Sequence, residues 1–571
     1  MAISTTAEII KSTLPDVEIP NTNIPDFFFK HIRQHVEFVD ESNPRPVLIS
    51  GTSADEFLTV EQMEAMSKKF ATGLYHSVGV RGGDVVAVIL PNSIYYAPVV
   101  LGILMLGASC TLANPANTAR ELVYQLKDSG AAWIVTTLAI KDVVGDAATE
   151  LASLIRKIMF IEKEGVPENE SSVFDIMCTD VSTHCPEDTE QQPTADSVAF
   201  IPYSSGTTGH PKGVLLTHRN IIANILQVLG LQTYVDPGTS GDSSAPSCIN
   251  GTTVAVLPMY HIYGLLFHCF QGACRGVTTV VMAKFDMLKF LALIEQYKAT
   301  EALLAPPIVN GLAKMRTTTQ KYDLSSMRSV LVGAAPLSKD TIATLEEQMP
   351  GLKVFQGYGL TETSPAVSLN RYEDRVIESS GRLLPNIEAK VVDDDGNTLD
   401  VGARGELCFR GPNIMIGYLN RKEDTERAID QDGFFHTGDI GYVDAQQHVY
   451  LTDRKKELIK YNGFQVAPAE LEGIILQHPS VHDCAVVGIY DEARQTEVPR
   501  AFLVLSHEKA ADEKIDMAET EIANQVVEWT NGQVAYYKHL RGGYVILESI
   551  PKSAAGKILR RVLKARHSGA V

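Results

Sequence analysis

Residues 198–214 read Val-Ala-Phe-Ile-Pro-Tyr-Ser-Ser-Gly-Thr-Thr-Gly-His-Pro-Lys-Gly-Val, an apolar run that leads into a loop rich in Gly, Ser and Thr. The apolar run has the composition of a strand. The loop suits an anion, because glycines let backbone N–H groups approach closely, hydroxyls add donors and a lysine adds positive charge. We therefore predict a phosphate-binding loop after a strand, formed by Ser204, Ser205, Gly206, Thr207, Thr208, Gly209, Lys212 and Gly213.

Two other interpretations of this loop are less favoured. It is not a Walker A motif, because the Lys-Ser/Thr pair of that motif is missing: Gly213 follows Lys212. A flexible surface loop could have the same composition. The length of the segment, its lysine and its position directly after a strand favour phosphate binding instead.

The overall composition indicates a soluble globular chain with several domains. At 571 residues the chain exceeds what one core usually supports, and its 45% hydrophobic and 21% charged residues are ordinary. The net charge of -19 argues against nucleic acid or an anionic membrane as the main partner. We expect small-molecule partners and a monomer or weak homodimer.

Cysteine usage and the absence of targeting signals predict a cytoplasmic protein. The eight cysteines contain no Cys-x-x-Cys pair, which is typical of reduced intracellular thiols rather than of disulfides or a zinc site. The first residues show no secretory signal, and the last residues are not the Ser-Lys-Leu peroxisomal signal. The most apolar stretch, Ala97–Ala113, is short for a membrane span and is interrupted by Gly and Pro, so we expect no span.

Two regions alternate helical spacing with short apolar runs, which predicts an α/β fold with parallel βα units. One region covers residues 94–160, and the other covers residues 253–367. In the first, we interpret the apolar runs Leu122–Leu126, Ala132–Thr136 and Ile155–Ile161 as strands.

The segments around these regions predict little regular structure. We expect a lead-in with proline-rich turns over residues 1–50 and a polar surface insertion over residues 162–196. A loop rich in Gly, Ser and Pro at 235–251 indicates no particular chemistry.

The pattern changes twice towards the C-terminus. Residues 387–452 contain short alternating strands with Asp-Gly and Gly-Asn turns, which predict a small β subdomain. Charge density then rises over residues 453–457, and the remainder reads as a compact α+β unit. We therefore predict a large N-terminal domain over residues 1–453, made of βα layers and the β subdomain, and a smaller α+β domain over residues 454–571.

Five short motifs occur in order: the 204–213 loop, Tyr-Gly-Leu-Thr-Glu at 358–362, His-Thr-Gly-Asp at 436–439, Asp-Arg at 453–454 and Pro-Lys-Ser-Ala-Ala-Gly-Lys at 551–557. With this set the chain resembles, over nearly its whole length, the adenylate-forming superfamily of acyl-CoA ligases, firefly luciferase and peptide-synthetase adenylation domains. Gly-Glu-Leu-Cys-Phe-Arg-Gly at 405–411 and the stretch 457–472 are most similar to 4-coumarate–CoA ligases.

This resemblance implies a two-step reaction. A carboxylate attacks the α-phosphate of ATP and expels pyrophosphate, and the thiol of coenzyme A then displaces AMP from the acyl-adenylate. The first step brings an anion onto a polyanion, so it needs positive charge and oriented donors, with Mg2+ at the phosphoryl oxygens. The 204–213 loop would wrap the β- and γ-phosphates.

The resemblance assigns nucleotide contacts to the second, third and fourth motifs. Tyr358 would stack on adenine, Thr361 would donate to the α-phosphate, and Glu362 is a hard oxygen ligand suited to Mg2+. Asp439 would accept from the ribose hydroxyls, and Arg454 would contact ribose or phosphate at a hinge. Tight packing beside the purine would come from Gln356, Gly357, Gly359 and Leu360.

The resemblance also implies that the C-terminal domain is mobile and serves both steps. Lys557 would reach the α-phosphate and the substrate carboxylate during the first step. After rotation at the hinge, Lys460 and Gln465 would lie near the nucleotide, and Gly463 and Lys284 would contact coenzyme A. The pattern departs at Asn462, where many relatives carry a second lysine, which weakens one expected coenzyme A contact.

The acid would bind where His261 gates and orients the carboxylate and Tyr263 lines the acyl pocket. The pocket walls would come from Ala334, Ala335, Pro365 and Ala366. Plant hydroxycinnamate ligases often have valine or glycine where this chain has Ala366 and Ala334. Small residues leave room for a flat ring or for an alkyl chain. We therefore expect a hydroxycinnamate such as 4-coumarate, with a fatty acyl-CoA ligase, a luciferase-like oxygenase or a non-catalytic nucleotide-binding protein as alternatives.

Overall fold

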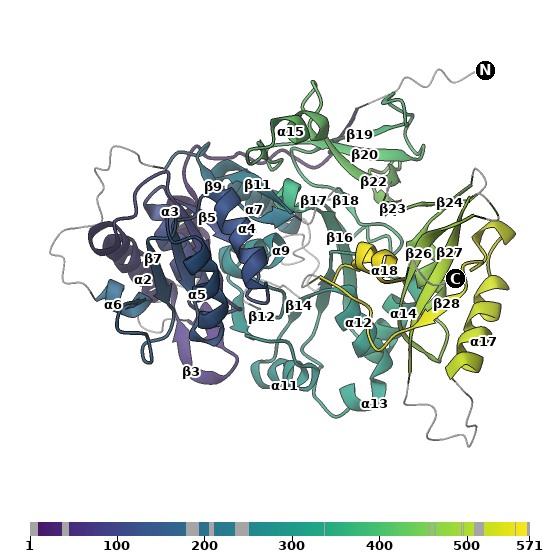
Figure 1. Ribbon diagram of the computed structural model, residues 1–571, viewed down its shortest axis with the longest axis horizontal. Coiled ribbons are helices and arrows are strands. Elements are labelled where there is room, and N and C mark those ends of the chain that lie inside the picture. Colours follow the sequence, from purple (N-terminus) through teal and green to yellow (C-terminus); the bar gives the residue numbers. More distant parts are fainter. Residues whose placement is uncertain are drawn as a thin grey trace.

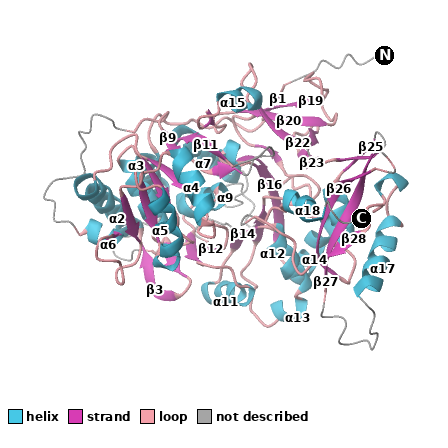
Figure 2. Ribbon diagram, in the orientation of Figure 1, coloured by secondary structure: helices cyan, strands magenta, loops and turns pink. Residues whose placement is uncertain are grey.

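The computed structural model describes residues 9–36, 45–178, 193–204, 211–233, 251–335, 337–454, 457–461, 464–492, 494, 496–506, 519–553 and 556–567. The fold is α/β, with two large sheets, a third, antiparallel sheet and a smaller C-terminal unit (Figure 1). Figure 2 shows helices packed around the strands of the large sheets. The predicted fold class is confirmed.

The first large sheet has a parallel centre and an antiparallel edge. Its strands run in the order β10 (Tyr203–Ser204), β11 (Lys212–Thr217), β9 (Val198–Phe200), β5 (Ser109–Leu112), β4 (Val85–Val88), β6 (Trp133–Thr136), β7 (Lys157–Phe160) and β8 (Ser171–Ser172), and β21 (Gly417–Tyr418) pairs with β11. The associated helices are α2 (Val60–Gly73), η1 (Leu74–Val78), α3 (Tyr96–Met105), α4 (Ala119–Ser129), η2 (Leu138–Ile140), α5 (Lys141–Glu150) and α6 (Val173–Met177).

The second large sheet also has a parallel centre, with antiparallel pairs towards its edges. Its order is β18 (Arg382–Leu383), β17 (Ala366–Leu369), β16 (Lys353–Gly359), β15 (Ser329–Val332), β14 (Glu301–Leu304), β12 (Thr252–Ala255), β13 (Thr278–Val281), β2 (Leu48–Ser50) and β3 (Ser53–Leu58). The helices of this part are α1 (Ile24–His35), α7 (His218–Thr233), α9 (Ile262–Gly264), η3 (Leu265–Gln271), α10 (Gly272–Cys274), α11 (Met287–Tyr297), α12 (Pro306–Lys314), α13 (Arg316–Thr319), α14 (Lys339–Gln348) and η4 (Thr361–Thr363).

The third sheet and the C-terminal unit complete the fold. The third sheet runs β1 (Ile10–Lys11), β19 (Glu388–Val392), β20 (Gly405–Arg410), β22 (Phe435–Val443) and β23 (Val449–Arg454), with α15 (Lys422–Ala428) beside it. The C-terminal unit contains β24 (Ile459–Tyr461), β25 (Phe464–Val466), α16 (Pro468–Ile475), β26 (Val481–Asp491), β27 (Thr496–Leu505), α17 (Glu519–Asn531), η5 (Tyr536–Lys538), β28 (Tyr544–Ile546) and α18 (Arg560–His567). The domain boundary at residue 453 stays a prediction.

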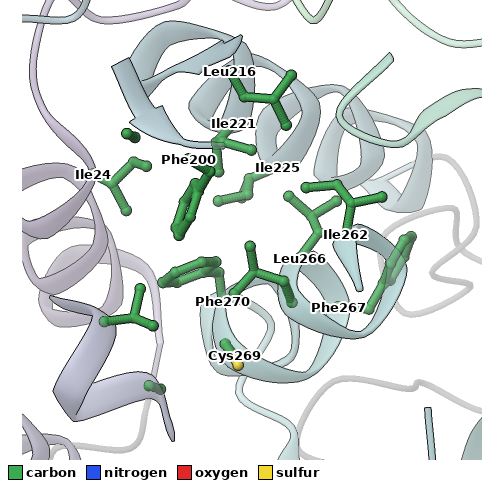
Figure 3. Close-up of a cluster of buried hydrophobic side chains, with 14 of the residues drawn as sticks. Ile24, Phe200, Leu216, Ile221, Ile225, Ile262, Leu266, Phe267, Cys269 and Phe270 are labelled. Atoms are coloured by element: carbon green, nitrogen blue, oxygen red, sulfur yellow. The ribbon is translucent and has the colours of Figure 1, made fainter. Parts of the chain in front are cut away.

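One hydrophobic core joins the three N-terminal sheets. Ile221 and Ile225 of α7 pack with Phe270 of η3 and Phe200 of β9, as Figure 3 shows. The same cluster extends to buried residues of all three sheets, including Val86, Leu303 and Phe409. These elements therefore cannot shift independently without opening apolar surface to water.

Three structural expectations were wrong in part. Leu122–Leu126 lies inside helix α4, which a Thr118–Glu121 capping box begins and Gly130 in the left-handed conformation ends. The lead-in contains β1, α1 and β2, and β1 pairs with β19 far along the chain. The polar insertion contains β8 and α6. Strand β1 is stabilised by pairing with a distant strand, which the local sequence pattern does not report, whereas α4 carries its capping signals in its own sequence. The loop at 235–251 falls outside the described residues except for Gly251.

Gly381 and Gly396 allow a test of close backbone packing. Both have positive φ (+88° and +85°), but a Cβ on Gly381 would lie 1.8 Å from the carbonyl carbon of Leu369, whereas one on Gly396 would meet no atom within 4 Å. We expect Gly396→Ala to cost about 1–2 kcal/mol of unfolding free energy. Gly381→Ala should cost more than about 4 kcal/mol, because the backbone must move as well. Urea unfolding of both variants measures this, and equal losses would contradict the packing argument.

Candidate functional site

Two strands of the first large sheet and the end of β16 in the second meet around the carboxylate of Glu362. The Glu362 Oε1 atom accepts hydrogen bonds from Ser204 Oγ at 2.9 Å and from the Tyr418 hydroxyl at 3.0 Å. Ser204 ends β10, Tyr418 lies on β21, and Glu362 lies in η4 just after β16. The structure thus brings the first residue of the predicted phosphate loop and the predicted Mg2+ ligand into direct contact.

Lys212 lies at the same edge but is engaged with an acid. Its Nζ lies 3.0 Å from Asp424 Oδ2 and 5.1 Å from the centre of the Tyr418 ring. Hydrogen bonding to Lys212 lowers the pKa of Asp424 below its usual range. Ser205, Gly206, Thr207, Thr208 and Gly209 lie outside the described residues.

The chain folds back so closely after strand β16 that position 359 must be glycine, and a Cβ at position 357 fits only if the Leu369 side chain moves. A Cβ on Gly359 would lie 1.9 Å from the Pro365 carbonyl oxygen, and one on Gly357 would lie 2.3 Å from Leu369 Cδ2. The peptide N–H of Leu360 donates to the same Pro365 oxygen at 3.0 Å. Gln356 uses its side chain locally, accepting from Leu337 N and donating to the Ile377 carbonyl. Thr361, next to Glu362, is half-buried.

Asp439 and Tyr358 join the third sheet to the second. The Tyr358 hydroxyl donates to Asp439 Oδ2 at 2.6 Å, and both side chains are buried. Two of the residues predicted to surround a nucleotide are therefore in contact.

Glu406, a residue that the sequence did not single out, fixes the turn before Asp439. Its Oε1 accepts from the Gly438 N–H at 3.0 Å, and Gly438 has φ +70°. Thr437 Oγ1 donates to the Leu407 carbonyl at 2.8 Å and accepts from Asp439 N at 3.0 Å. The orientation of the Asp439 backbone is thus set by β20 on one side and by its own turn on the other.

His261 and Tyr263 lie between β12 and η3. The Nδ1 of His261 accepts from the Tyr263 N–H at 3.3 Å and caps α9. Burial lowers the pKa of His261 to about 4, so the imidazole is neutral at pH 7, with its proton on Nε2. A neutral donor of this kind can hydrogen-bond a carboxylate without forming an ion pair.

Tyr263 is held by its ring and by its hydroxyl. The ring covers Gly333, where a Cβ would lie 3.1 Å from Tyr263 Cε1, and it packs edge-on against Phe267 at 5.3 Å. The hydroxyl donates to the Leu331 carbonyl at 3.2 Å. This donation leaves the oxygen lone pairs as acceptors. Burial raises the pKa of Tyr263 well above its ordinary value, so the hydroxyl stays protonated.

Of the four predicted wall residues, Ala334 and Ala335 lie just after β15, and Pro365 and Ala366 lie at the start of β17. Ala334 has φ +74°, a conformation that costs a non-glycine residue of the order of 1–3 kcal/mol, and it is exposed. Ala335 follows and is half-buried. Pro365 follows a cis peptide bond, and Ala366 begins β17 and is buried.

Buried amides that the sequence did not single out hold the Thr363–Ala366 segment. Asn224 of α7 pairs with both main-chain groups of Ala366, at 3.0 and 2.8 Å. Asn413 donates to the carbonyls of Ala366 and Thr363, at 2.9 and 2.7 Å. One signal was available: Asn220, Asn224 and Gln227 recur at helical spacing in an otherwise apolar helix.

The C-terminal unit brings Lys557 to the large domain. A Cβ on Gly556 would lie 3.2 Å from Ala305 Cβ and 3.4 Å from Pro307 Cδ, so the residue before Lys557 packs on the start of α12. The Lys557 backbone is fixed within its own loop, where its N–H donates to Ser553 Oγ at 3.2 Å and its carbonyl accepts from Ser553 N at 2.7 Å.

The residues predicted to serve the second step are only partly described. Lys460 is exposed on β24, and its N–H donates to Glu497 at 2.9 Å. Lys284 is exposed just after β13. The backbone of Arg454 pairs with Asp439, and that of Gln465 pairs with Lys460, but their side chains and all of Gly463 fall outside the described part.

The described residues contain no group of three or more His, Cys, Asp or Glu placed to hold a metal ion. Among their helices, none combines the length and the apolar character that a membrane crossing requires. The described site residues include oriented hydroxyl donors on the carboxylates of Glu362 and Asp439, and the segment after β12 adds a neutral imidazole and a tyrosine. Such a set can orient a polar, oxygen-rich ligand.

Residues 37–419 match the AMP-binding enzyme family, and residues 470–557 match the AMP-binding enzyme C-terminal domain. The chain is 38% identical to 4-coumarate–CoA ligase 1 of Petroselinum crispum, over 98% of this chain and 96% of that protein. Two solved structures are similar. ATP-bound MatB from Rhodopseudomonas palustris has a TM-score of 0.77 and 25% identity, covering 95% and 99% of the two chains. The o-succinylbenzoate CoA synthetase of Bacillus subtilis, with an acyl-adenylate intermediate, has a TM-score of 0.75 and 25% identity, covering 96% and 99%.

His436, two residues before Gly438, gives the stability a defined pH dependence. Its pKa is raised, first by Glu406 at 3.8 Å and then, against the opposing effect of burial, by Asp430 at 3.4 Å. A raised pKa stabilises the fold below the unfolded value of about 6.5, and this contribution is lost as the pH rises through the folded pKa. We expect the melting-temperature advantage of the unmodified protein over His436→Gln to be largest near pH 6 and to shrink by pH 8.5.

His31 provides the matched control for this titration. Burial lowers its pKa, followed by the charge of His35. The folded state therefore binds that proton less readily than the unfolded state, and His31→Gln should become relatively more stable as the pH falls. The same pH dependence in both variants would contradict the assignment.

Proposed function

This chain belongs to the AMP-binding enzyme family, and from that premise we propose that it is a ligase that joins 4-coumarate or a related hydroxycinnamate to coenzyme A. The reaction consumes ATP, passes through an acyl-adenylate and releases AMP and pyrophosphate. The observation that carries the proposal is the similarity to a 4-coumarate–CoA ligase along almost the entire length of both chains. The contacts among Ser204, Glu362, Tyr358 and Asp439 support it.

In the nucleotide site, the 204–213 loop holds the β- and γ-phosphates, and Asp439 accepts from the ribose hydroxyls. Tyr358 lines the adenine, with Gln356, Gly357, Gly359 and Leu360 forming the strand beside it, and Thr361 donates to the α-phosphate. The Tyr358–Asp439 hydrogen bond orients the carboxylate before the nucleotide binds. Arg454 adds positive charge at the ribose or phosphate.

Mg2+ fits at Glu362, because a buried carboxylate with two hydroxyl donors on one oxygen keeps a fixed orientation. A single carboxylate suits an ion that arrives with the nucleotide phosphates rather than a resident ion, since Mg2+ usually keeps several water and phosphate ligands. Bound there, Mg2+ would neutralise phosphate charge. The chain's own contribution is to hold that carboxylate in place.

In the acid site, neutral His261 donates from Nε2 to the substrate carboxylate, which keeps its negative charge for attack on phosphorus. Tyr263 offers its lone pairs to a phenolic hydroxyl, because its own proton is committed to the Leu331 carbonyl. A flat ring then fits between Tyr263 and the small side chains of Ala334, Ala335, Pro365 and Ala366. The hydrogen-bond acceptor on Tyr263 favours a phenolic acid over a fatty acid as the substrate.

The C-terminal domain, which we place at residues 454–571, serves the two steps in turn. Lys557 neutralises the carboxylate and the α-phosphate during adenylation, from a loop that packs on α12. Rotation near residue 453 then presents Lys460, Gln465 and Gly463 for thioester formation, together with Lys284 of the large domain. One site thereby supports two reactions with different requirements.

The direct test measures AMP release that depends on both ATP and coenzyme A, across cinnamates, benzoates and fatty acids. We expect 4-coumarate or a close hydroxycinnamate to give the highest kcat/KM. No AMP with any acid would refute the ligase assignment, and a preference for dodecanoate would refute the substrate assignment. Light emission or oxygen uptake after adenylation would indicate a luciferase-like oxygenase.

Lys557→Ala should slow acyl-adenylate formation by about 100-fold or more, because it removes the charge that bridges two anions. Thioester formation from supplied acyl-adenylate should remain largely intact. Lys564→Ala, on the neighbouring helix α18, is the matched control and should leave both half-reactions unchanged. Equal losses of both half-reactions in Lys557→Ala would refute this role.

A further inference from the structure

Helices α12 and α14 form one rigid face of the large domain. Gln348 Nε2 of α14 donates to the Ala313 carbonyl of α12 at 2.7 Å, and Thr341 Oγ1 lies 3.2 Å from Asn310 Oδ1. Val309, Leu312, Ile342 and Leu345 bury their side chains in one cluster beneath them. We call residues 306–314 and 339–348 the docking face, because the C-terminal unit lies against it.

The side chain of Lys314, at the end of α12, binds the start of strand β26 in the C-terminal unit. Its Nζ donates to the carbonyl oxygens of Val481 and His482, both at 2.9 Å. These residues lie at a bulge, since Val481 pairs with Leu505 and Asp483 pairs with Val504, leaving His482 without a ladder partner. A bulge redirects backbone groups away from the sheet, and here it turns two carbonyls towards one cation.

Three more contacts involve helices α12 and α14 or the bulge of β26. Gln477 Nε2, after α16, donates to Asp340 Oδ2 in the first turn of α14 at 2.7 Å. Gly556 packs against the other end of α12, at Ala305 and Pro307. Asp483, next to the bulge, pairs with Lys552 at 2.6 Å and so links the bulge to the loop that carries Lys557.

The interface between the large domain and the C-terminal unit can open. Among the hydrophobic clusters of the described residues, only one joins the large domain to the C-terminal unit, and it consists of Ile440, Leu458 and Ala467 close to residue 453. Away from that pivot, the contacts described above are the packing of Gly556 on the start of α12 and hydrogen bonds from side chains, which water can replace at low cost. Interfaces of this kind permit relative motion of domains.

We propose that Lys314 and Asp340 are positioning residues that hold the C-terminal unit in the arrangement for acyl-adenylate formation and release it for the thioester step. The proposal rests on the proposed function, in which the unit rotates between steps. Neither residue touches the substrates. Lys314 acts through the carbonyls of Val481 and His482, and Asp340 acts through the side chain of Gln477. These contacts hold the C-terminal unit on the docking face, and the Asp483–Lys552 pair connects them to the loop in which Gly556 and Lys557 lie.

The test compares Lys314→Met and Asp340→Ala with Lys339→Met, because alanine at position 340 removes the acceptor for Gln477. Lys339 lies on the same docking face but pairs with Glu378 of the large domain, so it is the matched control. Two rates are measured: acid-dependent exchange of pyrophosphate into ATP, and thioester formation from supplied acyl-adenylate. We expect each of the two positioning variants to slow the exchange by about fivefold to tenfold and to leave the second rate within about twofold. Lys339→Met should change neither rate.

Two outcomes would overturn the inference: unchanged exchange in both positioning variants, or equal loss of both rates at unchanged melting temperature. Because Asp340 and Lys314 contact different segments, a folding defect in one variant leaves the other as a test. Refutation of the proposed function itself gives a different result, because the unmodified protein would then show neither rate with any acid.

Discussion

Two buried amide side chains, Asn224 and Asn413, fix the segment around which the site is built. Between them they saturate the main-chain groups of Ala366 and bind the Thr363 carbonyl, although Asn224 comes from α7 and Asn413 from the loop after β20. Removing either would leave buried polar groups without partners, which costs more than a hydrogen bond normally contributes. The η4 turn with Glu362 and the β17 end with Ala366 depend on this support.

The same arrangement explains how a strongly acidic chain can handle acidic substrates. The described acids of the site are already occupied: Glu362 accepts two hydroxyls, Asp439 accepts Tyr358, and Glu406 accepts the Gly438 N–H. His261 is neutral, so it neither repels nor traps a carboxylate. Lys212 lies at the edge of this site, and its ammonium group is paired with Asp424.

The sequence predicted the α/β class and the motifs that form the site, because those motifs are local: a Gly-rich turn or a strand end is recognisable from its own residues. It did not predict the partners of these motifs. Nothing near Tyr418 in the sequence indicates that it binds Glu362. Likewise, nothing near Glu406 indicates that it holds the turn before Asp439. Leu122–Leu126 was misinterpreted for the opposite reason, since a local signal, the Thr118–Glu121 capping box, starts the helix about one turn before this short apolar run.

Strand β1 has a consequence for how the protein is made. Ile10 pairs with Ala389, so the strand is synthesised long before its partner. At roughly 5–20 residues per second, about 20–80 s pass between the two. During that interval Ile10 and Lys11 cannot enter the sheet, and Thr13 cannot yet bind Gln447. The third sheet therefore closes only near the end of translation, and a ribosome that stalls before residue 388 leaves the first strand with no edge to join.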